Sequence, residues 1–180
     1  MLTPRLAVTL NALGLYAIGL ILFAAFVFQF ALGELPCPLC LLQRVAFATL
    51  AVGPILNLRY GPRPSHYALS LIAAIAGAGI SMRQVLLHII PGDPGYGSMI
   101  LGAHYYTWAF ICFAAAIALL SIVLLSDRQF ESREAPLPGL FAKGAVFLVI
   151  AMIAANVLNV FVECGPSVCP DNPVSYWMLR

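Results

Sequence analysis

Long apolar stretches alternate with short polar connections along the whole chain. About 20 consecutive apolar residues are enough to cross the hydrocarbon core of a membrane as a helix, and five stretches reach this length. The expected spans lie at about 8–32, 37–57, 67–90, 104–126 and 142–162. The pattern predicts an all-α integral membrane protein, with one membrane domain over 1–180 that ends in an extracytoplasmic tail at 163–180.

The second stretch indicates where its helix must begin. Only fourteen uncharged residues separate Arg44 from Arg59, and at about 1.5 Å per residue they are too few to cross about 30 Å of hydrocarbon. The helix reaches the necessary length only if it starts near Cys37 and carries Arg44 inside. Pro38 is tolerated in a first helical turn, because the N–H groups there have no intrahelical partner.

The first stretch has one feature of a signal peptide, because Arg5 precedes an apolar run. However, the uncharged segment at 6–33 is about twice as long as a typical signal-peptide core, and it is long enough to span the bilayer. Cleavage near its end would also remove the first helix of the bundle. We therefore expect an uncleaved anchor.

The composition agrees with a membrane protein. Hydrophobic residues make up 62% of the 180 residues and charged residues 9%, whereas soluble domains are about half apolar and a quarter charged. The formal net charge of +2 comes without a dense basic patch. Nucleic acid is therefore not an expected partner.

The basic residues favour one orientation, because cytoplasmic loops carry an excess of Lys and Arg. With the N-terminus inside, the cytoplasmic side collects Arg5, Arg59, Arg63, Arg128, Arg133 and Lys143. The outer side keeps Arg180, together with Arg44 and Arg83 near the outer ends of their spans. The bias puts the C-terminal tail outside.

The five cysteines form two close pairs and one single position. In this orientation Cys37/Cys40 and Cys164/Cys169 both face the extracytoplasmic side, where disulfides form and persist. Two pairs of sulfur ligands also suit zinc, but an oxidising compartment favours disulfides, and a nearby arginine opposes a cation. We expect no metal. Cys112 lies alone in an apolar stretch and is expected to be a small core residue.

Cys37, Cys40 and Arg44 have separations of three, four and seven residues, which share one face of a helix. The positive end of the helix dipole lies at the same place, and both the dipole and the guanidinium favour a thiolate over a thiol. Because a thiolate attacks a disulfide or a quinone ring, we expect redox activity here. The alternative is a permanent disulfide, although a two-residue gap removes little entropy from the unfolded chain.

At these residues the sequence resembles the DsbB family, bacterial membrane proteins that regenerate disulfides. The motifs that carry the resemblance are Cys37-Pro-Leu-Cys40, Gln43-Arg44, Arg83-Gln84 and the segment 101–110. The resemblance covers the first four expected spans. It implies a DsbB-like four-helix bundle in the bacterial inner membrane, to which this chain adds a fifth, C-terminal span.

The resemblance also implies a function. In that family the Cys-x-x-Cys pair passes electrons to a bound ubiquinone or menaquinone. By resemblance, Cys40 is nearer to the quinone, Cys37 exchanges with another disulfide, and Arg44 polarises a quinone carbonyl. The expected activity is thiol–disulfide oxidoreduction, in which a soluble DsbA-like thioredoxin-fold protein is reoxidised and a membrane quinone receives the electrons.

The chain departs from the family in its second cysteine pair. The family carries that pair between the third and fourth spans, whereas 91–103 contains no cysteine and Cys164/Cys169 follow the fifth span. We expect this displaced pair to take electrons from the soluble partner and relay them to Cys37/Cys40. The alternative is a structural disulfide that fixes the tail.

A polar strip of Arg83, Gln84 and His88 lies near the outer end of the third span. Ionisable groups inside a membrane are costly, so function is the default hypothesis. We expect the strip to line a quinone pocket, with Gln84 or His88 bonded to a carbonyl oxygen. The alternative is that Arg83 extends to the interface or pairs with Glu34 or Glu163.

Two further patterns predict helix packing. Ala73, Gly77 and Ser81 form a row of small residues at four-residue spacing, which lets a neighbouring helix approach closely. Asn156 and Asn159 are expected to make interhelical hydrogen bonds.

Two other functions are compatible with the sequence. The first is a non-catalytic accessory subunit of a larger membrane complex, although such a subunit has little use for Cys37, Cys40 and Arg44 together. The second is a reductive enzyme, as in the related vitamin K epoxide reductases. The direction of electron flow distinguishes that enzyme from an oxidase.

Overall fold

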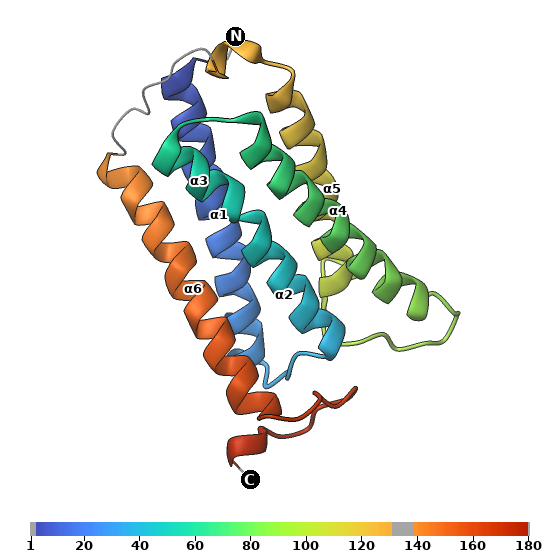
Figure 1. Cartoon of the computed structure of the whole chain (residues 1–180). Coiled ribbons are helices and arrows are strands. Elements are labelled where there is room, and N and C mark those ends of the chain that lie inside the picture. Colours follow the sequence, from blue (N-terminus) through green and yellow to red (C-terminus); the bar gives the residue numbers. More distant parts are fainter. Residues whose placement is uncertain (1–2, 131–138, 180) are drawn as a thin grey trace.

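The computed structural model describes residues 3–130 and 139–179, which form a helical bundle (Figure 1). Its main helices are α1 (Pro4–Ala31), α2 (Pro38–Leu50), α3 (Val52–Tyr60), α4 (Pro64–Leu87), α5 (Tyr105–Leu124) and α6 (Leu140–Cys164). The shorter elements are strands β1 (Met99–Ile100) and β2 (Ala103–His104) and the 3₁₀ turns η1 (Asp127–Phe130) and η2 (Trp177–Leu179). With α2 and α3 taken together, five helical segments of the described chain are long and apolar enough to span a membrane. The predicted fold class is confirmed.

The helices pack around one apolar core. α4 lies along α5 and α2, and α1 lies along α6 and α3 (Figure 1). The buried members of the core are Ala12, Leu15, Ile18, Leu22, Ala46, Phe47, Leu50, Ala51, Leu58, Ala73, Ala74, Phe113, Ala142, Ala145 and Val149. Large apolar side chains such as Leu20, Ile72 and Phe147 stay exposed. Such a surface is expected of helices that contact lipid rather than water.

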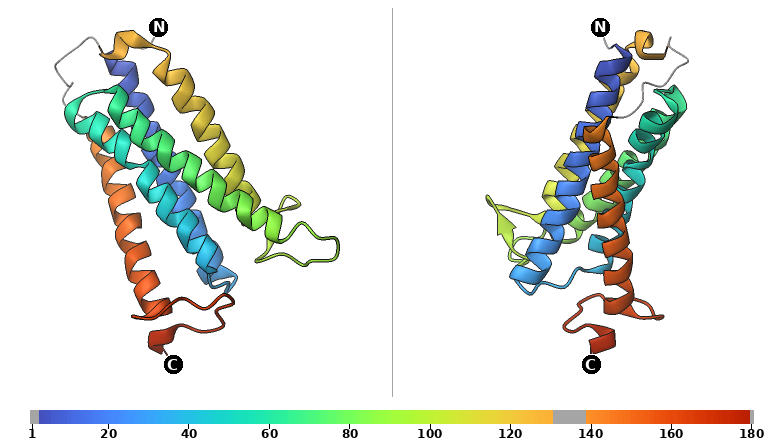
Figure 2. Two further views of the ribbon diagram at one scale, coloured as in Figure 1. Left: turned by 45° about the vertical axis from the view of Figure 1, so that its right-hand side comes forward. Right: turned by 90° about the vertical axis from the view of Figure 1, so that its left-hand side faces the viewer.

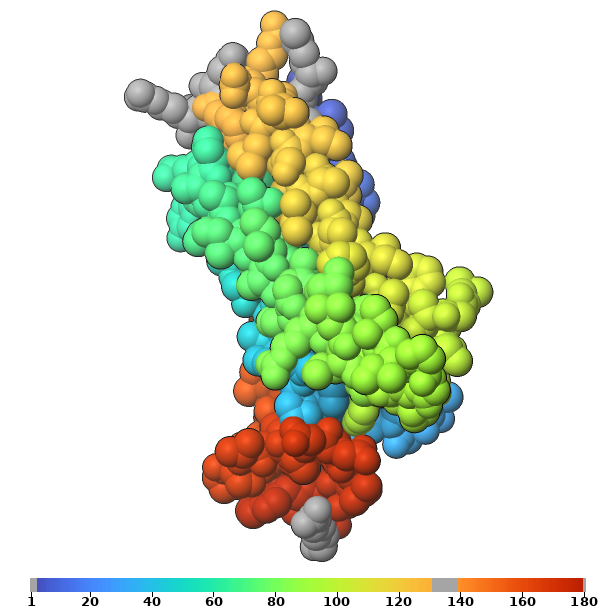
Figure 3. Space-filling view, turned by 90° about the vertical axis from the view of Figure 1, so that its right-hand side faces the viewer, coloured from blue at the N-terminus to red at the C-terminus, as the bar shows by residue number. Residues whose placement is uncertain are grey.

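Both cysteine pairs lie at the same end of the bundle, because α2 begins and α6 ends there (Figures 1 and 2). Figure 3 shows the C-terminal tail below the start of α2. Arg5, Arg59 and Arg63 lie toward the opposite end, where α1 begins and α3 meets α4. Which end faces the cytoplasm stays a prediction, and Arg133 and Arg180, which that prediction also uses, lie outside the described residues.

The second span is bent between Leu50, the last residue of α2, and Val52, the first residue of α3. Pro54 has no N–H and cannot bond to the Leu50 carbonyl one turn earlier. The Ser70 hydroxyl of α4 donates to that carbonyl instead, at 2.8 Å. Gly53 allows this close approach of α4, because a Cβ there would overlap the Ser70 oxygen.

The predicted row of small residues on α4 packs against α5. Ala73, Gly77 and Ser81 are all buried, and the Phe113 ring of α5 occupies the space that a Cβ on Gly77 would fill. Phe113 itself is fully buried and stacks on Phe47 of α2, with ring centroids 4.0 Å apart. The packing interpretation of this row is confirmed.

Replacement of Gly77 by alanine is expected to lower the free energy of unfolding by about 1–3 kcal/mol, because the added methyl group overlaps a buried ring. Gly79 is the matched control, since it lies on the same helix and nothing lies within 4 Å of the position of its Cβ. Gly79→Ala should stabilise α4 by up to about 1 kcal/mol. Thermal unfolding in detergent measures both changes, and equal melting temperatures would contradict this account of the packing.

Candidate functional site

The Cys37–Cys40 disulfide lies at the start of α2. Cys37 is the N-cap of the helix, and its sulfur accepts a hydrogen bond from the Cys40 backbone N–H at 3.1 Å. Pro38 is the first helical residue, where a missing N–H breaks no hydrogen bond. Cys37 is only 6% exposed, whereas Cys40 is half-buried. The helix therefore begins at the cysteine pair, as the length of the second span predicts.

A buried amide of α4 contacts both sulfurs. Gln84 Nε2 donates to Cys37 Sγ at 3.3 Å and to Cys40 Sγ at 3.6 Å. Its Oε1 accepts a hydrogen bond from Gln43 Nε2 at 2.9 Å, and this bond fixes the orientation of the amide. The sequence suggested that Gln84 contacts a quinone carbonyl. The structure places this side chain, which is 1% exposed, against the disulfide.

The Arg44 guanidinium is held by α1 and α6. Its Nη1 donates to Gln29 Oε1 at 2.9 Å, and its Nη2 donates to the Ala25 carbonyl at 3.1 Å. A longer hydrogen bond of 3.4 Å reaches Asn156 Oδ1 on α6, and the Phe26 ring centroid lies 5.3 Å from the guanidinium carbon. Within the described residues, no hydrogen bond joins Arg44 to either sulfur.

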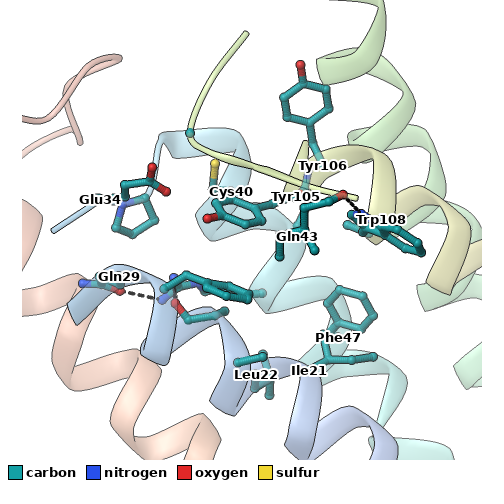
Figure 4. Close-up of a pocket in the computed structure, with 18 of the residues that line it drawn as sticks. Ile21, Leu22, Gln29, Glu34, Cys40, Gln43, Phe47, Tyr105, Tyr106 and Trp108 are labelled. Atoms are coloured by element: carbon teal, nitrogen blue, oxygen red, sulfur yellow. Dashed lines mark hydrogen bonds between the residues drawn. The ribbon is translucent and has the colours of Figure 1, made fainter. Parts of the chain in front are cut away.

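Cys40 and Arg44 instead share a cavity of about 420 Å³. Its wall comes from α1, α2, α5 and the connections at 34–36 and 96–101 (Figure 4). The rings that line it are Phe28, Phe47, Tyr96, Tyr105, Tyr106 and Trp108. Cys112 packs against the core, as expected, and also lines this cavity. An apolar cavity with a few polar groups on its wall is typical of a small-molecule site.

Two buried polar atoms on the cavity wall have no hydrogen-bond partner among the described residues: Glu34 Oε2 and the Tyr105 hydroxyl. The other oxygen of Glu34 accepts a hydrogen bond from the Ser98 hydroxyl. Sequence reasoning missed both as site residues, because it considered Glu34 only as a possible ion-pair partner of Arg83 and included Tyr105 only as part of the segment 101–110. The available signal was a lone carboxylate three residues before Cys37.

Tyr96 connects two loops at the cavity. Its hydroxyl donates to the Leu35 carbonyl in the connection between α1 and α2. Burial raises the pKa of Tyr96 to about 12, with smaller contributions from the negative charges of Glu163 and Glu34. The phenol therefore stays protonated at neutral pH and keeps donating to Leu35.

Two residues of the predicted polar strip lie away from the cavity wall. Arg83 is exposed. His88 Nδ1 lies 3.0 Å from Asp93 Oδ1, and its ring lies 5.6 Å from that of Tyr106. The Gly95 N–H and then the His88 contact lower the pKa of Asp93. The structure therefore brings neither Arg83 nor His88 into the wall that Cys40 and Arg44 share.

The second cysteine pair forms a disulfide at the end of α6. Cys164 is 3% exposed, whereas Cys169 is half-buried in the tail. Gly165 has a φ of 61°, and the Trp177 ring occupies the space that its Cβ would fill, so the tail folds back over the end of the helix. Because both cysteine pairs are disulfides, neither offers thiolates to a zinc ion in this structure.

A chain of hydrogen bonds connects Arg44 to the end of α6. Gln29, which accepts from Arg44, donates through Nε2 to Asn159 Oδ1 at 2.8 Å and to the Tyr176 hydroxyl at 2.9 Å. Asn159 Nδ2 in turn donates to Glu163 Oε2 at 3.2 Å. The predicted interhelical role of Asn159 is confirmed. Sequence reasoning missed Gln29, although an amide within an apolar span was a usable signal.

The family described as Disulfide bond formation protein DsbB matches this chain over residues 7–97. The matched range contains Cys37, Cys40, Arg44 and Gln84. It ends before α5, α6 and the second cysteine pair. The match therefore reaches three spans rather than the expected four, and the segment 101–110 lies outside it.

Curated relatives agree with this match. "Disulfide bond formation protein B" of Xanthomonas axonopodis pv. citri is 46% identical over 80 residues, which cover 42% of this chain and 46% of that protein. The protein of the same name from Chromobacterium violaceum is 40% identical over 81 residues, or 43% of this chain and 46% of the relative. That from Aromatoleum aromaticum is 35% identical over 87 residues, or 45% of this chain and 52% of the relative.

The chain thus spans about half the length of the curated relatives it matches. No solved structure matches it significantly. The family match, in contrast, covers half of the chain and includes the cysteine pair at the start of α2. This multi-pass membrane protein therefore belongs to the DsbB family of disulfide bond formation proteins.

Proposed function

We propose that this protein is a quinone-dependent protein-dithiol oxidase of the bacterial inner membrane. It takes electrons from an extracytoplasmic DsbA-like thioredoxin-fold protein and passes them to ubiquinone or menaquinone. The observation that carries the proposal is the shared cavity, because Cys40 of the disulfide and the Arg44 cation both lie on its wall.

The cavity residues fit a quinone. The aromatic side chains suit a flat conjugated head group, and the apolar residues of α1 and α5 suit an isoprenoid tail. Arg44 has five N–H donors, and its hydrogen bonds to Gln29, Ala25 and Asn156 leave donors for a carbonyl oxygen. When bound, the quinone supplies a two-electron acceptor.

Cys40 is the sulfur proposed to deliver the electrons. It lies in the first turn of α2, where the helix dipole and the Gln84 amide both favour a thiolate. Oxidation of the Cys37/Cys40 dithiol re-forms the disulfide and releases two electrons and two protons. Cys37, the sulfur expected to exchange with a partner, is buried, so exchange there requires the connection before α2 to open.

The second disulfide is proposed to receive the electrons first. Cys169 is more exposed than Cys164, so an incoming thiolate attacks Cys169 and Cys164 is the leaving sulfur. The location of both pairs at one end of the bundle supports exchange between them. In a Cys164→Ser variant, a partner that carries its own disulfide should therefore be trapped as a mixed disulfide with the Cys169 thiolate, because the thiol that would resolve it is missing. Trapping at Cys37 instead would contradict the relay.

Replacement of Gln84 by leucine is expected to lower the reduction potential of the Cys37/Cys40 pair. Its amide donates to both sulfurs, and a donor stabilises the thiolate of the reduced form more than the uncharged disulfide. A hydrogen bond to a charged group contributes about 1.5–3 kcal/mol, which corresponds to about 30–60 mV for a two-electron couple. Equilibration with glutathione or dithiothreitol buffers measures the potential.

Gln129→Leu is the matched control for this substitution. Gln129 is also fully buried and hydrogen-bonded, but it lies in η1 and bonds to Tyr67 and to two backbone carbonyls. Its replacement should lower stability without changing the potential of the cysteine pair. Equal shifts in both variants would mean that Gln84 has only a structural role.

The proposed function is tested with purified protein in detergent, a reduced thioredoxin-fold protein, and ubiquinone or menaquinone. Dithiol-dependent loss of quinone absorbance is the expected result. Co-purification with other membrane subunits at fixed stoichiometry, without any such turnover, would favour the accessory-subunit alternative. Net oxidation of quinol with reduction of a protein disulfide would favour the reductive enzyme.

A further inference from the structure

The two carboxylate oxygens of Glu34 have different surroundings. Glu34 lies in the connection between α1 and α2, three residues before Cys37. Its Oε1 accepts a hydrogen bond from the hydroxyl of Ser98, an exposed residue. Its Oε2 is buried without a partner in the described part of the chain, and the side chain forms part of the cavity wall. One oxygen is thus close to solvent, and the other lies beside Tyr105 on the cavity side.

The Tyr105 hydroxyl shares this part of the wall. It is also buried without a hydrogen-bond partner among the described residues. A Cβ on Gly97 would lie 3.2 Å from the Tyr105 ring and 3.4 Å from Glu34 Oε2, so the two side chains meet at one glycine. Figure 4 shows Glu34, Cys40 and Tyr105 around the same cavity. The two groups interact with each other, and both face the cavity from the same part of its wall.

Glu34 is the only carboxyl group on the described cavity wall. The other polar groups there are poor proton donors. Arg44 keeps its proton in proteins, and the amides of Gln29 and Gln43 do not titrate. Tyr96 has a pKa of about 12 and already donates to a backbone carbonyl.

We propose that Glu34 is the proton-donating residue of the quinone cavity: its carboxyl group transfers a proton from Oε2 to a quinone oxygen and recovers it from water through Ser98. The proposal rests on the proposed function and adds a catalytic residue to it. Cys40 must be a thiolate before it reacts, so it has no proton to give to the quinone. Glu34 provides a proton that does not come from the sulfurs.

The Cys37/Cys40 dithiol loses two electrons and two protons as the disulfide forms, and these protons leave to water. The bound quinone accepts both electrons and two protons. Glu34 provides one proton, and water at the cavity mouth provides the other. A proton from water then restores the carboxyl of Glu34 through the Ser98 hydroxyl.

Charged and titratable groups from several elements surround Glu34. Tyr105 of α5 and Tyr96 of the loop before β1 both interact electrostatically with it. Arg44 of α2 lies on the same cavity wall. Glu163 of α6 acts on Tyr96 as well. The pH dependence of the reaction therefore includes these neighbours, and a variant must isolate the contribution of Glu34.

Glu34→Gln keeps the shape of the side chain and its acceptor oxygen but removes the transferable proton. We expect reduction of quinone by the pre-reduced protein to become about 100-fold slower, as is typical of the loss of a general acid. Quinone affinity, measured by quenching of Trp108 fluorescence, should change little, because the amide still donates a hydrogen bond.

Infrared difference spectra with and without quinone give a readout that does not depend on turnover. Binding should perturb a carboxyl band of the wild type, and labelling with ¹³C-glutamate should shift that band. The band should disappear in Glu34→Gln and persist in Glu163→Gln, a control at the buried glutamate near the end of α6. Labelling assigns the band to a glutamate, and comparison with Glu163→Gln then distinguishes Glu34 from the buried Glu163.

The outcomes separate this inference from the proposed function. A wild type that reduces quinone, with an unchanged rate in Glu34→Gln and no perturbed carboxyl band, would overturn the role of Glu34 alone. A wild type without quinone reduction would overturn the proposed function. Ser98→Ala should leave the first turnover unchanged and slow the later ones, and equal rates throughout would contradict the route through Ser98.

Discussion

Replacement of Cys40 by serine is expected to abolish quinone reduction by a dithiol substrate. Cys40 is the sulfur of the pair that lines the cavity, and a serine hydroxyl neither forms a disulfide with Cys37 nor ionises at neutral pH. The bundle should keep its fold, because this disulfide closes only a two-residue gap. The rate of quinone absorbance loss measures the effect, and normal turnover would contradict the mechanism.

The double replacement of Cys164 and Cys169 by serine is the matched comparison for that variant. It also removes one disulfide, but it leaves the cavity wall intact. If the second pair is a relay, dithiothreitol should still drive quinone reduction while a reduced protein partner no longer does. If the second pair is structural, both substrates should be affected to the same extent.

Replacement of Arg44 by methionine is expected to weaken quinone binding about 10- to 100-fold, because a hydrogen bond from a charged donor contributes about 1.5–3 kcal/mol. Methionine retains much of the apolar volume of the arginine side chain. The loss also frees Gln29 Oε1 and the Ala25 carbonyl from their partner, so a modest fall in stability accompanies it. Titration with quinone, followed by protein fluorescence, measures the affinity.

Arg59→Met is the control for the Arg44 substitution. Arg59 is exposed near the end of α3 and contacts the neighbouring Tyr60 ring. Its replacement removes the same charge from the same span but leaves the cavity unchanged. Equal losses of affinity in the two variants, or no loss in Arg44→Met, would contradict the role of Arg44 as a quinone ligand.

The spans could be predicted from the sequence because hydrophobic length is a property of a continuous segment. The start of the second helix at Cys37 followed from counting residues between two arginines. The bend near Pro54 could not be predicted in this way, because it depends on a hydroxyl of α4. Ser70 bonds to the Leu50 carbonyl that the proline leaves free, and only the packed structure brings these residues together.

The site was predicted in part. Helical spacing brought Cys40 and Arg44 to one cavity, yet it could not reveal that Gln29 of α1 and Asn156 of α6 hold the guanidinium. The same limit applies to Gln84, because its rotamer depends on the hydrogen bond from Gln43. The conformation of the loops could not be predicted from the sequence. It brings the Ser98 hydroxyl to Glu34, although the two residues are 64 positions apart.

The central claim is that electrons pass from the Cys37/Cys40 pair to a quinone in the cavity. A single-turnover experiment tests it most directly: the protein is reduced under anaerobic conditions, mixed with one equivalent of quinone, and quenched with an alkylating reagent at successive times. The account predicts that each quinone reduced coincides with loss of alkylation at Cys37 and Cys40, at the same rate. Quinone reduction while both cysteines remain fully alkylated, or no reduction at all, would contradict it.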